Sequence, residues 1–341
     1  MSGVLSPRLP ASGGVRVVRS ARVRTIARQV GSALLTLLLI SIVTFGMMSV
    51  RGPSQIAHEK FGNQITPAQI DAFAHKYHLD RTVVERYGTW LWHFVHGDMG
   101  TSFVTDVAVS DNVIPRFERT LILSLVALFV SLPISIAIGV FQARRLGSWS
   151  DLSLLSGSVV VAALPEFVVG IGLLFLFGVE LGWLPVDSAT ALTFASSFTD
   201  QAKAYLLPAA TLALAIIPYV ARIARGSVRE ALGAPYTQAA VLRGLSPQRV
   251  IWDHAMRNAG VPLVNAVAIN IVYLLSGVIV VEWVFAFPGI GQGIVQATST
   301  SDAYNVEAIA LLMGGMFVAV SLAADLVVAY LNPRLKAASA R

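Results

Sequence analysis

The chain of 341 residues is 55% hydrophobic and only 13% charged, and its mean hydropathy of +0.69 is far above that of an ordinary globular domain. This composition excludes a freely soluble domain and favours a protein whose solvent is lipid. The formal charge is +6, but the basic residues stand mainly between the apolar runs, so they indicate membrane topology rather than a nucleic-acid partner. The absence of cysteine excludes disulfides, thiolate metal sites and cysteine nucleophiles.

Apolar runs of about 20 residues are long enough to cross a hydrocarbon core of about 30 Å as helices. The chain has enough such runs to predict an all-α integral membrane protein with six transmembrane helices. The predicted spans cover residues 29–50, 119–141, 154–179, 205–224, 261–285 and 306–331. Prolines in or near the spans predict kinked helices, because neighbouring helices can satisfy the carbonyls that a proline leaves free. They are Pro133, Pro165, Pro208, Pro218 and Pro262.

The first apolar run follows an arginine-rich stretch, an arrangement that a signal peptide also shows. A signal peptide is the weaker interpretation, because no small-residue cleavage site follows the run and its length suits a full span. We therefore expect the first helix to be retained. Residues 1–26 are expected to form a flexible, Arg-rich cytoplasmic extension.

Lys and Arg in the short loops predict the orientation of the chain. The loops 142–151 and 225–257 are rich in arginine, whereas the loops 182–202 and 287–304 contain neither Lys nor Arg. Both termini, including the tail at 337–341, are therefore expected in the cytoplasm.

The segment 51–116 is expected outside the membrane. Within it, Thr66 and Pro67 give a helix start signal that is followed by helical apolar spacing, and a second helix is predicted from Val83 to Phe94. These two helices predict a small ordered external cap.

The cytoplasmic loop 225–257 is too long for a simple connection and is amphipathic and basic. Within it, Ala239 and Ala240 follow Gln238, and Gly244 stands four positions after Ala240. Two small side chains would allow a short helix to lie close to a partner's groove, and a glycine beyond its end would permit the chain to turn back. An amphipathic helix resting on the inner leaflet, with its arginines toward the headgroups, is the alternative interpretation.

The stretch from Gln238 to Gly244 resembles the A-A-x-x-x-G core of the loop by which permeases of ABC importers dock onto their ATPase subunits. From 27 to 336 the chain resembles the B-type permease subunits of dipeptide, oligopeptide and nickel ABC importers. The motifs that carry the resemblance are HLDR at 78–81, GDMGTSF at 97–103, GLSPQRV at 244–250, HAMRNAGVPL at 254–263, VEWVFAFPGIG at 281–291 and DLVVAYLNPRL at 325–335. Gln238 departs from the Glu of the general pattern, which puts one docking contact in doubt, and Arg257 replaces a Pro, as is usual in the peptide branch.

The resemblance implies a type I ABC importer permease fold for residues 27–336, in the inner membrane of a bacterial cell. It implies as partners a second homologous permease, two cytoplasmic ATPases that bind ATP and Mg, and an extracytoplasmic substrate-binding protein. Dipeptides or oligopeptides are the expected solutes, with nickel chelates, glutathione-like peptides or haem as alternatives. The residues expected to couple the chain to the ATPases are Tyr236, Gln238, Ala239, Ala240, Arg243 and Gly244.

Ionisable residues inside a membrane are costly unless they are paired or hydrated, which draws attention to Glu166, Glu282 and Asp325. Glu282 precedes the FPGIG turn near the outer boundary, where a structural hydrogen bond is preferred over contact with a solute. Three polar residues of the fifth span follow one another at three-residue spacing, which would place them along a path, although bonding between helices is the stronger explanation. The candidates for the translocation path are Asn270, Tyr273, Ser276 and Glu282.

Catalysis by this chain is not expected. It contains no G-x-x-x-x-G-K-[ST], H-E-x-x-H or G-x-S-x-G pattern, so ATP would be hydrolysed by partner chains, and no cofactor or metal is expected here. His93 and His96 have a spacing that suits metal ligands, but the aromatic residues around them favour a packed or interfacial helix. The rival classes are an ion-coupled secondary transporter, which would need no ATPase, and a membrane-embedded enzyme, which would need a cluster of polar catalytic residues.

Overall fold

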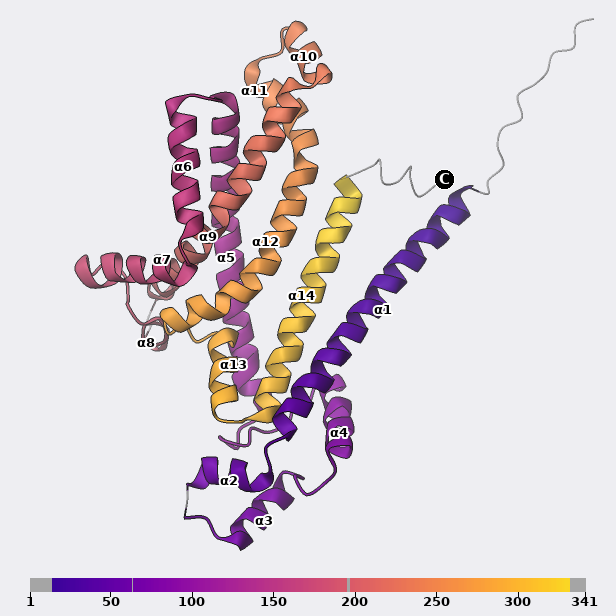
Figure 1. Ribbon diagram of the computed structural model, residues 1–341, viewed down its shortest axis with the longest axis vertical. Helices are drawn as coiled ribbons and strands as arrows, with labels where there is room; N and C mark the ends of the chain where they lie inside the picture. Colours follow the sequence, from indigo (N-terminus) through magenta and orange to yellow (C-terminus); the bar gives the residue numbers. More distant parts are fainter. Residues whose placement is uncertain (1–13, 63, 195–196, 332–341) are drawn as a thin grey trace, which may run out of the picture.

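The computed structural model describes residues 14–62, 64–194 and 197–331. Within these ranges it does not describe the side chains at 14–27, 59, 272, 275, 276, 324–326 and 328–331. The described fold is all-α, and its one pairing of extended chain is the bridge between Thr101 and Ala108. Short helices lie at both ends of an elongated bundle (Figure 1): α2 (Pro53–Phe61), α3 (Pro67–Lys76) and α4 (Val83–Val95) at one end, and α10 (Pro235–Leu242) and α11 (Pro247–Arg249) at the other.

The long helices of the described chain confirm a multi-pass membrane protein. Four are long and apolar enough to cross a membrane: α1 over Arg28–Ser49, α5 (Val109–Arg144), α9 (Phe198–Gly233) and α14 (Ala303–Leu331) over Ala303–Ala323. A bent pair of helices over Trp149–Glu180 makes a fifth crossing if it is counted as one span. Helix α12 (Met256–Val284) coincides with the fifth predicted span, and its 29 residues measure about 43 Å at 1.5 Å per residue.

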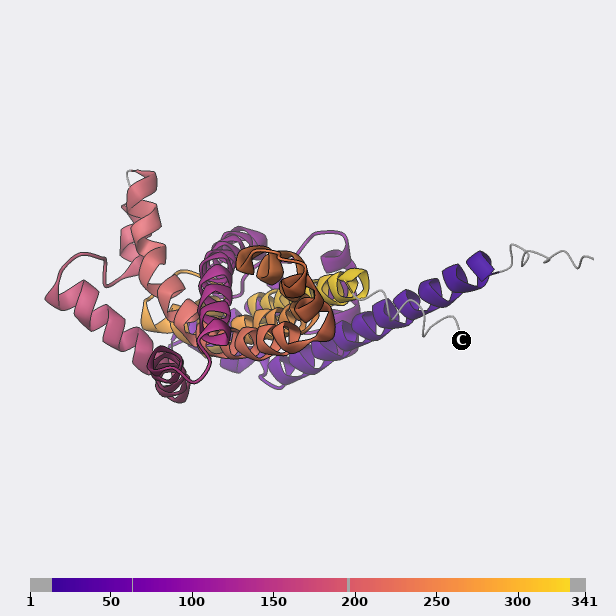
Figure 2. The same cartoon turned by 90° about the horizontal axis from the view of Figure 1, so that it is seen from above.

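Helix α1 (Gly14–Ser49) begins well before the first membrane segment. Residues 14–26 of the expected extension are helical, residues 1–13 lie outside the described chain, and the flexibility of the extension stays a prediction. The stretch from Val15 to Arg28 contains neither Gly nor Pro, so the helix of the membrane segment can propagate through it. Figure 2 shows this part of α1 running out from the bundle.

The third predicted span, residues 154–179, is not one straight helix. Helix α6 (Trp149–Ala163) is followed by Leu164 and Pro165, and then α7 (Glu166–Leu173) and the π-helical segment η1 (Leu174–Glu180) leave at an angle of 101°. Pro165 lacks an N–H and pushes the residue before it out of the helical region, and Leu164 accordingly has an extended ψ of 132°. Helix α7 projects sideways from the bundle above α8 (Ser188–Thr193) (Figure 1). The other prolines lie inside helices that continue through them: Pro133, Pro208, Pro218 and Pro262.

The core of the bundle lies where α5, α9 and α12 meet. Leu123, Ile216 and Val278, one from each helix, are all 0% exposed in a single cluster. Helix α9 is the central element, because 61% of its apolar window is buried, against 11% for α1. Helices α5 and α9 approach closely at Gly139, where a Cβ would lie 2.4 Å from the Cβ of Ala224. Small residues therefore set the crossing of the two helices.

The segment predicted as an external cap contains both expected helices. Helix α3 begins at Pro67 after the N-cap Thr66, and α4 begins at Val83 after the N-cap Thr82. Each start is a capping box, in which the side chain three residues after the cap bonds back to the cap's backbone N–H. The remaining elements are η2 (Val250–Ala255), which leads into α12, and α13 (Ile290–Ser299), which follows it.

Candidate functional site

Helix α10 lies in the middle of the 225–257 loop and ends in a glycine turn. It has Pro235 at its first position, where the missing N–H would have no helical acceptor. Gly244 stands just beyond its end with φ of +78°, and its N–H donates to the carbonyl of Val241 at 2.9 Å. No outside atom lies within 4 Å of the position that a Cβ would take, so the left-handed backbone is what requires glycine there. The predicted turn after a short helix is confirmed.

The small residues of α10 face in two directions. Ala240 is 4% exposed, whereas Ala239 is exposed, so the close approach that Ala240 permits is to the rest of this chain. Thr237 is buried too, and its hydroxyl donates to a carbonyl in the last turn of α9 at 2.7 Å. Gln238 is exposed, and its amide donates to the carbonyl of Gly233 at 3.3 Å. Helix α10 is thereby held firmly against α9.

The outward surface of α10 and α11 combines apolar side chains with arginines, and we call it the tip. Leu242 is 89% exposed and Tyr236 is 44% exposed. Arg243 and Arg249 are exposed, and neither forms an ion pair with a residue that the structure describes. An exposed apolar surface with a basic rim is typical of a site that another protein covers.

Behind the tip, a buried ion pair joins α6 to α9. Asp151 is 0% exposed, and Arg225 donates to it in bidentate fashion, from Nε at 2.8 Å and from a terminal nitrogen at 2.7 Å. The N–H of Gly147 donates to the same carboxylate at 3.0 Å. From the sequence, Arg225 is only one of the basic residues of the 225–257 loop, and its pairing with Asp151 was not predicted. The feature that could have pointed to Asp151 is that it is a single acid at the basic end of an apolar segment.

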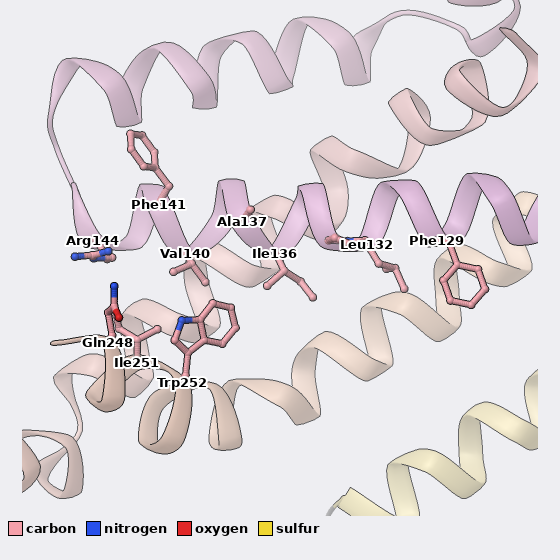
Figure 3. A pocket seen from close by; sticks show the side chains of 11 residues that line it. Phe129, Leu132, Ile136, Ala137, Val140, Phe141, Arg144, Gln248, Ile251 and Trp252 are labelled. Carbon is pink, nitrogen blue, oxygen red and sulfur yellow. The ribbon is translucent and has the colours of Figure 1, made fainter. Parts of the chain in front are cut away.

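An apolar groove of about 660 Å³ lies between α5 and η2 (Figure 3). Ile136 and Val140 line it from α5, Ile251 and Trp252 line it from η2, and Arg144 lies at one end. Because η2 connects the tip to α12 and also lines this groove, a displacement of the tip would act on the packing of both α5 and α12.

At the other end of α12, Glu282 caps the N-terminus of α13. Its carboxylate accepts hydrogen bonds from the N–H of Gly291 at 2.7 Å, the N–H of Gln292 at 3.1 Å and the hydroxyl of Thr120 at 2.5 Å. A Cβ at Gly289 would lie 2.0 Å from this carboxylate, so only glycine fits. The preferred prediction of a structural hydrogen bond is confirmed. Glu282 is 0% exposed in this chain, and its place on a solute path stays a prediction.

The three polar candidates of α12 differ in their surroundings. Asn270 is 6% exposed, and its amide donates to the carbonyl of Ala266 at 2.8 Å. Among the described residues, this amide therefore bonds to its own helix, and a bond from Asn270 to another helix stays a prediction. Tyr273 is 49% exposed, and its hydroxyl donates to Glu166 of α7 at 3.4 Å, so bonding between helices is confirmed there. Ser276 lies on α12, but its side chain is outside the described residues.

Glu166 lies directly after the break at Pro165 and is half-buried. Besides Tyr273, its carboxylate lies against Gly277, where a Cβ would be 2.7 Å away. A half-buried carboxylate beside an exposed tyrosine at a helix break is a strong candidate for contact with a solute. Sequence analysis singled out Glu166 as an ionisable residue but did not pair it with Tyr273, because the pairing depends on the bend. The side chain of Asp325 is outside the described residues.

His93 and His96, the pair whose spacing suits metal ligands, are not part of a metal-binding cluster among the described residues. His96 Nδ1 lies 2.7 Å from the carbonyl oxygen of Trp92, and the rings of these two residues are 4.3 Å apart. Among the residues that the structure describes, no group of three or more His, Asp or Glu side chains is placed to hold an ion.

The chain matches two families of transport proteins. Residues 135–337 match the family described as "Binding-protein-dependent transport system inner membrane component", and residues 22–124 match "Binding-prot-dependent transport system membrane comp, N-term". A putative peptide transport system permease protein of Brucella suis is 32% identical over 91% of this chain and 98% of its own length. An oligopeptide transport system permease protein of Bacillus subtilis is 31% identical over 88% of this chain and 95% of its own.

Two further comparisons agree with these matches. A di/tripeptide transport system permease protein of Pseudomonas aeruginosa is 28% identical over 91% of this chain and 98% of its own. Among solved structures, a chain of the inward-facing MetNI methionine ABC transporter has the same fold, with a TM-score of 0.52 and 17% identity over 65% of this chain and 96% of its own. The chain therefore belongs to the family of binding-protein-dependent transport system inner membrane components, the permease subunits of ABC importers.

Proposed function

We propose that this permease imports dipeptides or oligopeptides and forms one half of the path, with a second homologous permease forming the other. The substrate class is supported by relatives that are described as permeases of peptide, oligopeptide and di/tripeptide systems. Nickel chelates and haem have no comparable support. Membership of the family sets aside an ion-coupled secondary transporter and a membrane-embedded enzyme.

The observation that carries the coupling role is the tip, where Leu242, Arg243 and Arg249 are exposed and neither arginine forms an ion pair with a described residue. Two cytoplasmic ATPase subunits would bind ATP and Mg and hydrolyse it, and one of them would cover this tip. Exposed Ala239 would face that subunit, while buried Ala240 and Thr237 hold α10 on the permease.

The orientation that follows has both termini and the tip in the cytoplasm, with the cap facing an extracytoplasmic binding protein. The distribution of Lys and Arg among the loops supports it. So does the arrangement in Figure 1, where α1 starts and α14 ends toward the side of the molecule that carries α10.

Movement of the tip would reach the path through α12. Helix α10 is bonded to α9 through Thr237, and η2 joins the tip directly to α12, which carries Tyr273. Glu166 stands on α7, outside this connection, so rotation of α12 would change the contact between the two side chains. Within the path, Glu166 would offer a negative charge to the amino group of a peptide.

Ala239→Glu tests the coupling role, because position 239 is exposed and a longer side chain there disturbs no internal packing. Leaving a charge unpaired in a buried interface costs about 2 kcal/mol or more, so the affinity for the ATPase subunits should fall at least about 30-fold. The measurement is co-purification of the ATPases with the tagged permease, together with peptide-stimulated ATP hydrolysis. Ala72→Glu makes the same change at an exposed position of α3 and should leave co-purification unchanged. Normal assembly and normal stimulated hydrolysis of Ala239→Glu would disprove docking at the tip.

A further inference from the structure

Arg86, on α4 of the cap, is buried without an anionic partner. The residue is 8% exposed, its Nε has no hydrogen-bond partner, and no described carboxylate lies within ion-pair distance of it. Its guanidinium carbon lies 5.7 Å from the centre of the Phe45 ring. Burial lowers the pKa of Arg86 from its ordinary value, which shows that its charge is poorly solvated. Buried charges in proteins are normally paired, so Arg86 has an unfilled requirement for an anion.

Arg86 lines a pocket of about 490 Å³, a volume in the range of small-ligand sites. The pocket is bounded by α4, by the chain after α3 and by the first turn of α14, which contributes Tyr304. Trp90 also lines it, and its indole N–H is buried with no acceptor among the residues that the structure describes. Two unused donors, a guanidinium and an indole N–H, therefore belong to the wall of one pocket.

The charge of the pocket is positive and suits an anionic ligand. Lys76 lies 2.5 Å from Asp106, but Lys60 lies 2.6 Å from the same carboxylate, so one of these two ammonium charges is not compensated. Asp98 contributes one negative charge, while Arg81 is exposed and forms no ion pair with a described residue. Together with Arg86, this leaves an excess of positive charge around the pocket when its two lining histidines are neutral. An anion fits that balance, and the planar fork of arginine can bind a carboxylate through two parallel hydrogen bonds.

We propose that this pocket binds a carboxylate that arrives from outside the membrane, with Arg86 as its principal donor. Two sources present that group to the cap of an importer: the carboxyl terminus of a peptide solute and an acidic side chain of the docked binding protein. The choice of sources rests on the proposed function, whereas the pocket itself does not. His78 and Arg81 of the HLDR motif line the pocket, so the motif has a role that neither the tip nor the path uses.

The test measures thermal unfolding of the full chain in lipid nanodiscs, followed by tryptophan fluorescence. Trialanine should raise the unfolding temperature, and trialanine amide, which lacks the carboxylate, should not. Arg86→Met preserves volume and removes the unpaired charge. This variant should unfold at a higher temperature than the wild type without ligand, and it should bind trialanine at least about tenfold more weakly, the loss expected for a hydrogen bond to a charged group.

Two further variants separate charge from geometry. Arg86→Lys keeps the charge without the fork and should bind trialanine more weakly than the wild type but more tightly than Arg86→Met. Arg222→Met, at an exposed arginine of α9, should change neither unfolding nor binding. Equal stabilisation by trialanine and its amide, or undiminished binding by Arg86→Met, would overturn the proposal.

The probes also distinguish the sources. Stronger stabilisation by trialanine assigns the pocket to the carboxyl terminus of a solute. Stronger stabilisation by N-acetyl-glutamate amide, which presents only a side-chain carboxylate, assigns it to an acidic residue of a partner protein. Stabilisation by inorganic phosphate in place of both would refute a carboxylate site. None of these measurements involves ATPase subunits. A negative result for the carboxylate pocket can therefore be distinguished from a negative result for docking at the tip.

Discussion

Breaking the ion pair between Asp151 and Arg225 should destabilise the fold strongly, because the pair is bidentate and Asp151 is 0% exposed. Removing one partner of a buried pair costs about 3–5 kcal/mol, since the other charge is left unpaired. The Arg225 side chain is 20% exposed and can be reached by water. We therefore expect about 3 kcal/mol for Asp151→Asn, and more for Arg225→Met, which leaves the fully buried carboxylate alone.

The assay is the free energy of unfolding of the full chain in mixed micelles, measured by denaturant titration for both single variants and for the double variant. The double variant should cost less than the sum of the two by about 2 kcal/mol, because it leaves no unpaired charge. Lys203→Met is the matched control, since its exposed pair with Asp200 at 4.0 Å should contribute less than about 1 kcal/mol. Single-variant costs no larger than that of the control, or fully additive costs, would refute this reasoning.

Three further predictions concern the rest of the chain. Glu282→Ala removes the acceptor for the first N–H groups of α13 and should lower the free energy of unfolding by about 3 kcal/mol. Amide hydrogen exchange should become faster throughout α13. Unchanged exchange would show that the Glu282 carboxylate does not stabilise the start of α13. Gly139→Leu should prevent stable folding, because a Cβ there would lie 2.4 Å from a side chain of α9, while Gly226→Leu, where that position is open, should behave as wild type in size-exclusion chromatography. Hydrogen bonds from Lys60, and then from Lys76 and a tyrosine, lower the pKa of Asp106 in the folded chain. Its carboxylate therefore stabilises the cap at a pH above the unfolded pKa of about 3.9. This stabilisation is lost as the pH falls through the lower pKa of the folded state. Thermal unfolding between pH 3 and 6 should therefore depend less on pH in Asp106→Asn than in the wild type, and identical profiles would contradict the assignment.

Local features of the chain could be predicted from sequence, because their causes lie within a few residues. Runs of apolar residues identified the membrane segments, since hydrocarbon requires length and apolarity of any single helix. The Thr66-Pro67 start signal located α3, and Gly244 located the turn after α10, because capping and left-handed backbone depend on neighbours in the chain. Helix propagation into residues 14–26 was missed, although its cause is equally local.

Features that depend on residues far apart in the chain could not be predicted in the same way. Hydropathy treats 154–179 as one span, and only the packed bundle shows that the chain turns by 101° at Pro165 and brings Glu166 to Tyr273. The same holds for the pairing of Asp151 with α9, and for Arg86, which reads as an ordinary surface arginine until α1, α4 and α14 enclose it. Periodicity says which side of a helix is apolar, but the partner that a buried charge meets is decided by how separate helices pack.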